Sequence, residues 1–130
     1  MTATKGKQLE VTGKNKPGTG AAVFCALAGA KVNVTASCCF EMGNTGNFWL
    51  VVDKLPKAQA ALKKAGFKSK TADVVMLELP NKPGAMATAL EDIAELGVNV
   101  LYAYGSAAAG KTARLVMLTN KDAVVLRKLK

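Results

Sequence analysis

The sequence Asn15-Lys-Pro-Gly18 recurs as Asn81-Lys-Pro-Gly84, at an offset of 66 residues. At the same offset, Val32-Asn-Val34 falls on Val98-Asn-Val100. Nine of the 20 residues at positions 15–34 are identical to their counterparts. Self-similarity at a fixed offset is the mark of a duplicated structural unit, so this repeat decides how the rest of the chain is interpreted.

The similarity continues beyond the two motifs. Without a gap, the apolar run Trp49–Val52 falls on Leu115–Leu118. The chain of 130 residues is therefore predicted to be a tandem duplication, with a first unit at residues 1–70 and a second at 71–130. Two small units are within the range that a chain of this length can fold.

Each unit shows the same order of expected elements, β-α-β-β-α. In the first unit these are strand 9–11, a helix ending near residue 30, strands 32–40 and 48–52, helix 56–65 and a further strand at 67–71. In the second unit they are strand 74–79, a helix ending near residue 96, strands 98–104 and 114–118, and helix 121–130. The pattern predicts an α+β fold of two ferredoxin-like βαββαβ units, each an antiparallel sheet with helices on one face.

The second unit ends on its last helix and has no obvious fourth strand. Three arrangements are open: the N-terminal residues fill the edge of its sheet, another chain fills it, or the edge stays free. A free edge exposes unpaired backbone groups and favours oligomerisation.

Composition narrows the function. The chain has 18 Lys and Arg against 9 Asp and Glu, a net charge of +9, and no histidine. The lack of histidine excludes histidine-based triads and His-containing zinc sites, and no cluster of nucleophile and base is visible; we expect no catalytic residue, metal or cofactor. Residues 1–70 carry 11 basic and 3 acidic side chains, or +8, while residues 71–130 carry 7 and 6, or +1. Such an excess suggests an anionic partner, or simply a solvated face.

The termini and cysteines indicate a soluble, cytoplasmic protein without a membrane segment. The N-terminus, residues 1–8, is polar, and no apolar run reaches the roughly 20 residues that span a bilayer. Cys25, Cys38 and Cys39 have no CxxC spacing. We expect them to be small buried hydrophobic residues rather than a redox or metal site.

One nucleotide-binding motif is rejected. Gly105–Thr112 matches GxxxxGK[ST], and the run Phe48–Asp53 resembles a Walker B strand. A phosphate-binding loop must lead into a helix, whereas residues 113–118 look like a strand. We interpret residues 105–110 as the loop of a β-hairpin.

The repeat closely resembles the ACT domain, an amino-acid-sensing regulatory module of many biosynthetic enzymes. The resemblance rests on Asn-x-Pro-Gly before the first helix and Val-Asn-Val at the second strand, both present twice. It implies a non-enzymatic, allosteric sensor that binds a small molecule, an amino acid, between two modules, and it implies a homodimer. It also implies that the fold brings the two asparagines of each unit to one end of the sheet.

The turn has a physical reason to bind an amino acid. A helix N-terminus presents unpaired N–H groups and a positive dipole end to a carboxylate, and an asparagine offers both a donor and an acceptor to a zwitterion. The candidate ligand-binding residues are Asn15, Gly18, Thr19, Gly20 and Asn33 in the first unit, and Asn81, Gly84, Ala85, Met86 and Asn99 in the second. The wider Gly18-Thr-Gly20 turn suggests that the first site accepts the bulkier approach.

Three alternatives stay open. The turn and the asparagines can be purely structural. The protein can be the detached regulatory subunit of a biosynthetic enzyme. A basic ferredoxin-like sheet can also bind nucleic acid, although no segment matches an RNP motif, which makes this partner the weaker expectation.

Overall fold

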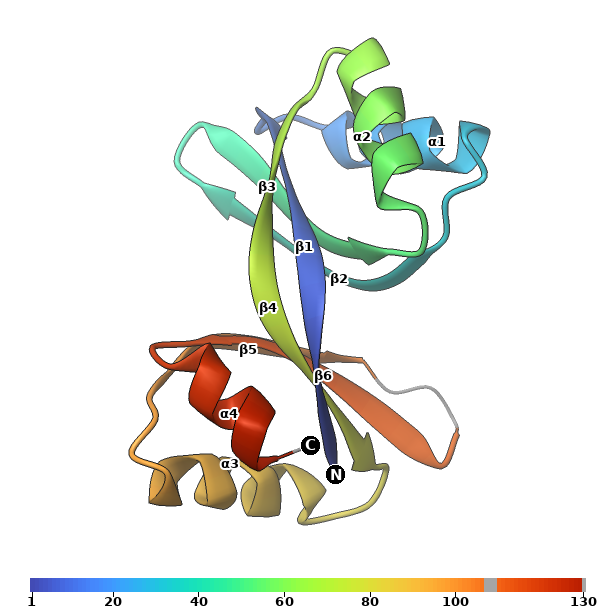
Figure 1. The fold of residues 1–130 in the computed structure, drawn as a ribbon. Coiled ribbons are helices and arrows are strands. Elements are labelled where there is room, and N and C mark those ends of the chain that lie inside the picture. Colours follow the sequence, from blue (N-terminus) through green and yellow to red (C-terminus); the bar gives the residue numbers. More distant parts are fainter. Residues whose placement is uncertain (107–109, 130) are drawn as a thin grey trace. The chain divides into compact units, whose positions relative to one another are not determined.

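The computed structural model describes residues 1–106 and 110–129 (Figure 1). The elements are β1 (Thr2–Lys14), α1 (Thr19–Gly29), β2 (Val34–Met42), β3 (Thr45–Val52), α2 (Leu55–Lys64), β4 (Lys68–Pro80), α3 (Ala85–Glu95), β5 (Val100–Ser106), β6 (Thr112–Thr119) and α4 (Asp122–Lys128). The strand order is β2-β3-β1-β4-β6-β5. The predicted α+β fold with two ferredoxin-like units is confirmed.

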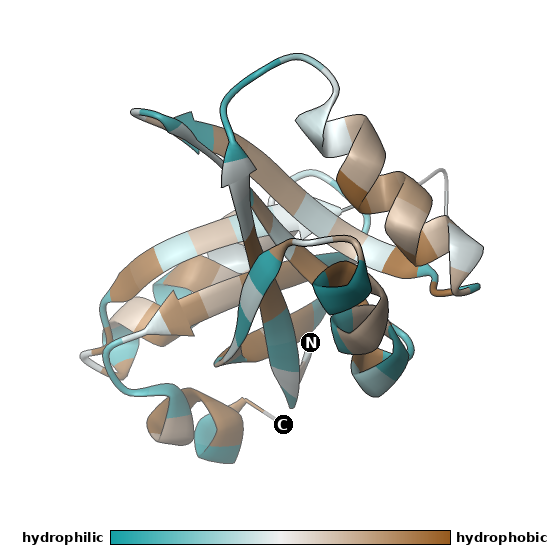
Figure 2. Cartoon of the chain, turned by 90° about the horizontal axis from the view of Figure 1, so that it is seen from above, coloured by the Kyte–Doolittle hydropathy of each residue, from teal (hydrophilic) through white to brown (hydrophobic). Residues whose placement is uncertain are grey.

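The first compact unit comprises Lys7–Ala72. Its strands follow the order β2-β3-β1-β4, and β3 pairs antiparallel with both β1 and β2. Helices α1 and α2 pack on one face, where Leu27 and Leu62 meet Leu9 and Leu50 in a buried core. Hydrophobic and polar residues alternate along the strands (Figure 2), as expected when one face of a sheet carries the core.

The second compact unit comprises Asp73–Lys130 together with Met1–Gly6. Its strand order, β5-β6-β4-β1, repeats that of the first unit, with the start of β1 in the fourth position. Ala3 is 5% exposed and lies in the core with Leu77, Ile93 and Met117, and its N–H donates to the carbonyl of Leu129 at 3.0 Å. The N-terminal residues therefore supply the strand that the second unit lacks.

The compact units thus differ from the expected division at residue 70. Residues 1–6 lie with the second unit, because the segment expected to be a polar tail is the beginning of a strand of 13 residues. Likewise, the two strands expected at 67–71 and 74–79 are one strand, β4, also of 13 residues. Each long strand contributes its two ends to different units.

The strand register corrects the internal alignment by one residue. Val11 pairs with Phe48 in the first unit, and its counterpart Leu77 pairs with Leu115 in the second. Phe48 therefore corresponds to Leu115, so the ungapped match of Trp49 with Leu115 was wrong. Between corresponding paired positions of the hairpin, the second unit has one more residue than the first: seven residues separate Ser106 from its partner Arg114, and six separate Phe40 from its partner Asn47.

The prediction that the three cysteines are buried was wrong. Cys25 and Cys39 are exposed and Cys38 is half-buried. Helix α1 has no charged residue and gives no polar face by which to judge exposure, and β2 is an edge strand. Partial burial raises the pKa of the Cys39 thiol, and neighbouring Cys38 adds to this rise, which disfavours the reactive thiolate.

The rejected phosphate-loop motif is a strand connection. Thr112 begins the strand β6 and not a helix, which confirms that the GxxxxGK[ST] match is not a P-loop. Of the loop predicted at 105–110, residues 107–109 lie outside the described residues. Within the described ranges, no helix is long and apolar enough to cross a membrane.

The N-terminal strand gives a direct test of the second unit. We expect Ala3→Asp to lower its free energy of unfolding by at least about 2 kcal/mol, because it places an unpaired charge in the core. Thr2→Asp is the matched control, since it adds the same charge at an exposed position. Thermal and urea unfolding measure the difference; equal stability of the two variants would show that residues 1–6 do not complete the core.

Candidate functional site

The Asn-Lys-Pro-Gly turn has the same geometry in both units. Gly18 and Gly84 are the N-caps of α1 and α3, with φ of 93° and 87°. These left-handed conformations favour glycine, which explains its recurrence at this position. Neither helix has a side-chain cap or an acidic residue in its first turn. The helix N-termini are therefore left for another group to complete.

The free backbone donors lie one residue further along than the sequence suggested. In the second unit the Ala85 N–H donates to Lys82 O at 3.3 Å and the Thr88 N–H to Gly84 O at 3.0 Å. Met86 and Ala87 lie between these two residues in the sequence, and their N–H groups donate to no partner among the described residues. These two amides, at the positive end of the helix dipole, form an anchor for a carboxylate.

The first unit repeats this pattern of donors. The Thr19 N–H donates to Lys16 O at 3.4 Å. The N–H groups of Gly20 and Ala21 have no partner in the described part of the chain. The predicted residue Thr19 has a structural role instead. It is 7% exposed, and its hydroxyl donates to Lys14 O at 2.8 Å.

Asn15 and Asn81 hold the turn against the neighbouring hairpin. The Nδ2 of Asn15 donates to Glu41 Oε2 at 2.6 Å and to Gly43 O at 3.2 Å, and that of Asn81 donates to Gly110 O at 3.0 Å. The side-chain donors of Asn15 are therefore occupied, which leaves only its amide oxygen for a ligand.

Asn33 and Asn99 lie at the opposite end of their units from the turns. The backbone of Asn33 bonds to Asp53, just beyond the end of β3, whereas the backbone of Asn15 bonds to Asn44, just before β3 begins. The eight residues of β3 separate these two ends. The expectation that the fold brings both asparagines of a unit to one end of its sheet was therefore wrong.

The second Asn of each repeat has a shared backbone role. The Asn33 N–H donates to Asp53 Oδ1 at 2.9 Å, and the Asn99 N–H donates to Asn120 Oδ1 at the same distance. Asp53 thus has a counterpart in Asn120, whose side-chain oxygen accepts the same hydrogen bond without a charge. The side-chain amides of Asn33 and Asn99 make no hydrogen bond within the ranges that the structure describes.

A cavity of about 330 Å³ lies against the turn of the second unit. Its lining includes Leu79, Asn81, Met86, Arg114 and Leu115. Another cavity, of about 460 Å³, flanks the same turn, but Met86 does not line it. The 330 Å³ cavity therefore has a free helix amide, an arginine and apolar walls together.

The matching place in the first unit is narrower. Phe48 takes the position of Leu115, and a Cβ on Gly20 would lie 3.3 Å from the Phe48 ring. In the second unit Met86 replaces this glycine and is 47% exposed. The ring of Phe48 therefore fills the space that the small residues of the first turn leave. This removes the reason to expect the bulkier ligand in the first unit.

Sequence reasoning missed Arg114 and Leu115 as site residues. They lie in β6, 28 or more residues after Met86, and the ungapped repeat placed them opposite the wrong residues. An alignment with one inserted residue would have shown that they occupy the strand beside the turn. Among the described residues, no group of three or more Cys, Asp or Glu could hold a metal ion.

The two repeated units together match a known family. Its profile, described as an ACT domain pair, matches residues 3–129. The chain belongs to the ACT domain pair family. This confirms the predicted resemblance over nearly the whole chain.

Solved structures place this ACT domain pair among similar folds. A protein from Bacteroides thetaiotaomicron is 32% identical, with a TM-score of 0.86 over 97% of this chain and 90% of that one. The aspartate kinase regulatory subunits of Thermus thermophilus and Thermus flavus are 17% and 18% identical, with TM-scores of 0.69 and 0.60. Each alignment covers 98% of this chain and 94% of the Thermus chain, and shows a shared fold. Comparison with curated proteins gives no match.

The free energy of unfolding of alanine variants can distinguish the roles of Asn15 and Asn33. Asn15→Ala removes two hydrogen bonds to the hairpin, and we expect it to lower the free energy of unfolding by about 1–2 kcal/mol. Asn33→Ala keeps its backbone bonds to Asp53, so we expect a loss below about 0.5 kcal/mol. Urea unfolding of both variants is the measurement, and a larger loss for Asn33→Ala would contradict these roles.

Proposed function

We propose that this ACT domain pair is a non-enzymatic, cytoplasmic regulatory protein that binds an amino acid at the N-terminus of α3. The observation that carries the proposal is the pair of adjacent amides of Met86 and Ala87, which have no partner among the described residues, and the cavity of about 330 Å³ that Met86 lines. Membership of the ACT family supports it.

Each part of an amino acid finds a complementary group at this site. The α-carboxylate accepts hydrogen bonds from the free helix amides. Arg114 adds a positive charge, which Glu78, 3.8 Å away, only partly balances. The α-ammonium group donates to the amide oxygen of Asn81, an acceptor that a zwitterion needs.

The walls of the cavity select the side chain. Leu79 and Leu115 are buried, and Met86 is half-exposed beside them, so the lining next to the free amides is apolar and adaptable. The cavity is also lined by Lys82 and Arg114, so a basic side chain would lose its hydration there and meet like charges. The ligand class is therefore an apolar amino acid of the size of valine, leucine or methionine.

Binding regulates by favouring one arrangement of units or subunits, because a ligand shifts an equilibrium only through its differential affinity for the two states.

We further propose a homodimer, since β2 and β5 end the strand order and present unpaired backbone groups. A biosynthetic enzyme is the proposed partner, since the two similar Thermus structures are regulatory subunits of aspartate kinase. Sedimentation and a pull-down from the native host test these two points.

A panel of the common amino acids tests the binding. We expect an apolar amino acid to raise the melting temperature by several degrees at saturating concentration, and lysine and arginine to leave it unchanged. Isothermal titration calorimetry then gives the affinity. If no amino acid raises the melting temperature, the proposed function is wrong.

A matched pair of variants locates the site. Ala87 and Ala21 are equivalent exposed alanines in the first turns of α3 and α1. An aspartate at either position stabilises the helix N-terminus, but it repels a carboxylate that binds there. We expect Ala87→Asp to abolish the shift and Ala21→Asp to preserve it. The reverse result would move the site to the first unit, and no effect in either would exclude the helix N-termini.

A further inference from the structure

The first unit has a second sheet face, away from α1 and α2, that the amino-acid site does not use. Phe48 lies in the core with the helices, so the neighbouring residues Asn47 and Trp49 point to the other face. Cα partners across a strand pair share a face: Glu10 pairs with Trp49, and Thr12 pairs with Asn47. Phe40 of β2 also pairs with Asn47 and joins the same face.

These residues line a cavity of about 410 Å³. The volume lies in the range of about 300–1000 Å³ that is typical of small-molecule sites. Its lining draws on all four strands of the unit, with Lys68, Ser69 and Lys70 contributed by β4. The cavity therefore combines aromatic, acidic and basic side chains.

One wall is an aromatic pair. The rings of Phe40 and Trp49 have centroids 4.8 Å apart and planes at 90°. An edge-to-face pair holds both rings in place. Both side chains are half-buried, so they form a rigid surface on which a planar group can stack.

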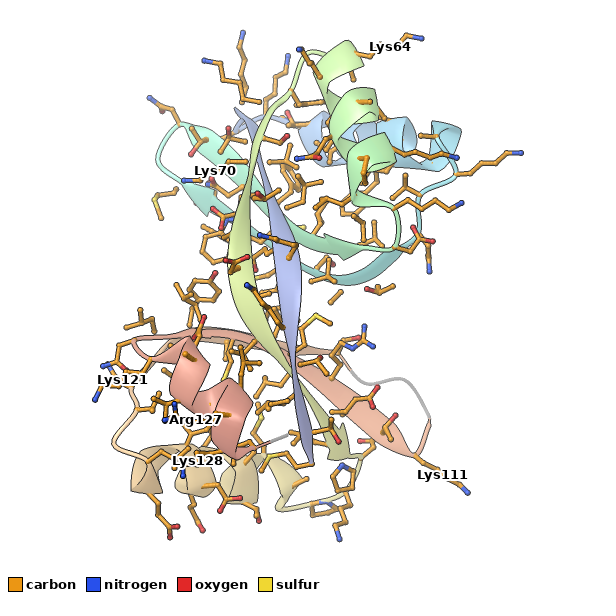
Figure 3. The ribbon with its side chains drawn as sticks, viewed as in Figure 1. Lys64, Lys70, Lys111, Lys121, Arg127 and Lys128 are labelled. Atoms are coloured by element: carbon orange, nitrogen blue, oxygen red, sulfur yellow. The ribbon has the colours of Figure 1, made fainter. Side chains whose placement is uncertain are left out.

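The opposite wall is basic. Lys68 and Lys70 are exposed, and Lys70 is labelled in Figure 3. The Nζ of Lys70 lies 3.8 Å from Glu10 Oε1, but its side chain is 80% exposed, so this ion pair is weak and easily rearranged. The ammonium groups can therefore turn to an anion at the mouth of the cavity.

Glu10 supplies a fixed acceptor between the two walls. Its side chain is only 13% exposed, and Gln8 Nε2 donates to its Oε2 at 3.0 Å. A held carboxylate accepts from the amino and ring N–H groups on the edge of a base, as in readout of cytosine and guanine. This acidic group makes a simple inorganic anion a poor occupant of the cavity.

We propose that this face binds a nucleotide unit, with the base stacked on Phe40 and Trp49, its N–H edge on Glu10 and its phosphate on Lys68 and Lys70. The same chemistry occurs in a free nucleotide and in a single strand. The proposal also gives a use to the +8 charge of residues 1–70, which the amino-acid site in the second unit does not explain.

Trp49 is the only tryptophan of the chain, so its fluorescence reports on the site. We titrate the full chain with guanosine and cytidine monophosphates, the corresponding nucleosides, and a mixed-sequence RNA octanucleotide at low and moderate salt. Nucleotides are expected to quench Trp49 and to bind about tenfold more tightly than nucleosides. An octanucleotide that binds far more tightly, with strong salt dependence, identifies the source as a single strand; equal affinity identifies the free nucleotide.

Two double variants provide a matched comparison. Lys68→Gln with Lys70→Gln removes the proposed phosphate contacts, whereas Lys57→Gln with Lys64→Gln removes the same charge from α2, on the helix side of the unit. The first pair should weaken nucleotide binding about tenfold and leave nucleoside binding unchanged; the second should change neither by more than about twofold. Phe40→Leu should weaken both.

Several outcomes would overturn the proposal: no quenching by any probe, equal binding of nucleosides and nucleotides, or equal loss in the two lysine variants. Ala87→Asp should leave the nucleotide titration unchanged. Failure of the amino-acid site and failure of the nucleotide site are therefore separate results.

Discussion

A ferredoxin-like unit needs four strands, and the second unit finds only three in its own segment of the chain. The insertion of residues 1–6 as its fourth strand is the contact on which the fold depends. Ala3 enters the core beside Ile93, and its N–H bonds to the carbonyl of Leu129. Without this strand, the apolar groups of that core would meet water along one side. The length of β1 follows from this requirement, since one strand must serve two cores.

The duplicated units keep their backbone geometry while their side chains have diverged. Gly18 and Gly84 retain the left-handed cap that opens each helix, and each helix has two amides without a partner among the residues that the structure describes. The space in front of these amides differs, because Phe48 stands where the second unit has Leu115. The units therefore share an anchor for a carboxylate but offer different surroundings to the rest of a ligand.

The sequence predicted what local physics determines. The repeated turn, the helices after it and the order of the elements follow from proline, glycine and apolar spacing, and the structure agrees. The fourth strand was left open, because a polar segment such as residues 1–8 shows its role only when a free sheet edge accepts it. The site residues Arg114 and Leu115 were missed for a related reason: a single inserted residue shifted the internal alignment. The resemblance placed Asn33 at the same end of the sheet as the turn, although the 11 residues of α1, about 16 Å of helix, lie between Asn33 and that turn.

The interrupted second unit also bears on the order in which the protein folds. The first unit is a continuous segment, Lys7–Ala72, whose contacts become available as soon as that segment is made. The second must join residues 1–6 to a partner strand and helix more than sixty residues further along the chain. Closing so long a loop is entropically costly and slows folding. On a ribosome, residues 1–6 must therefore stay unpaired, with Ala3 exposed to water, until β4 has emerged.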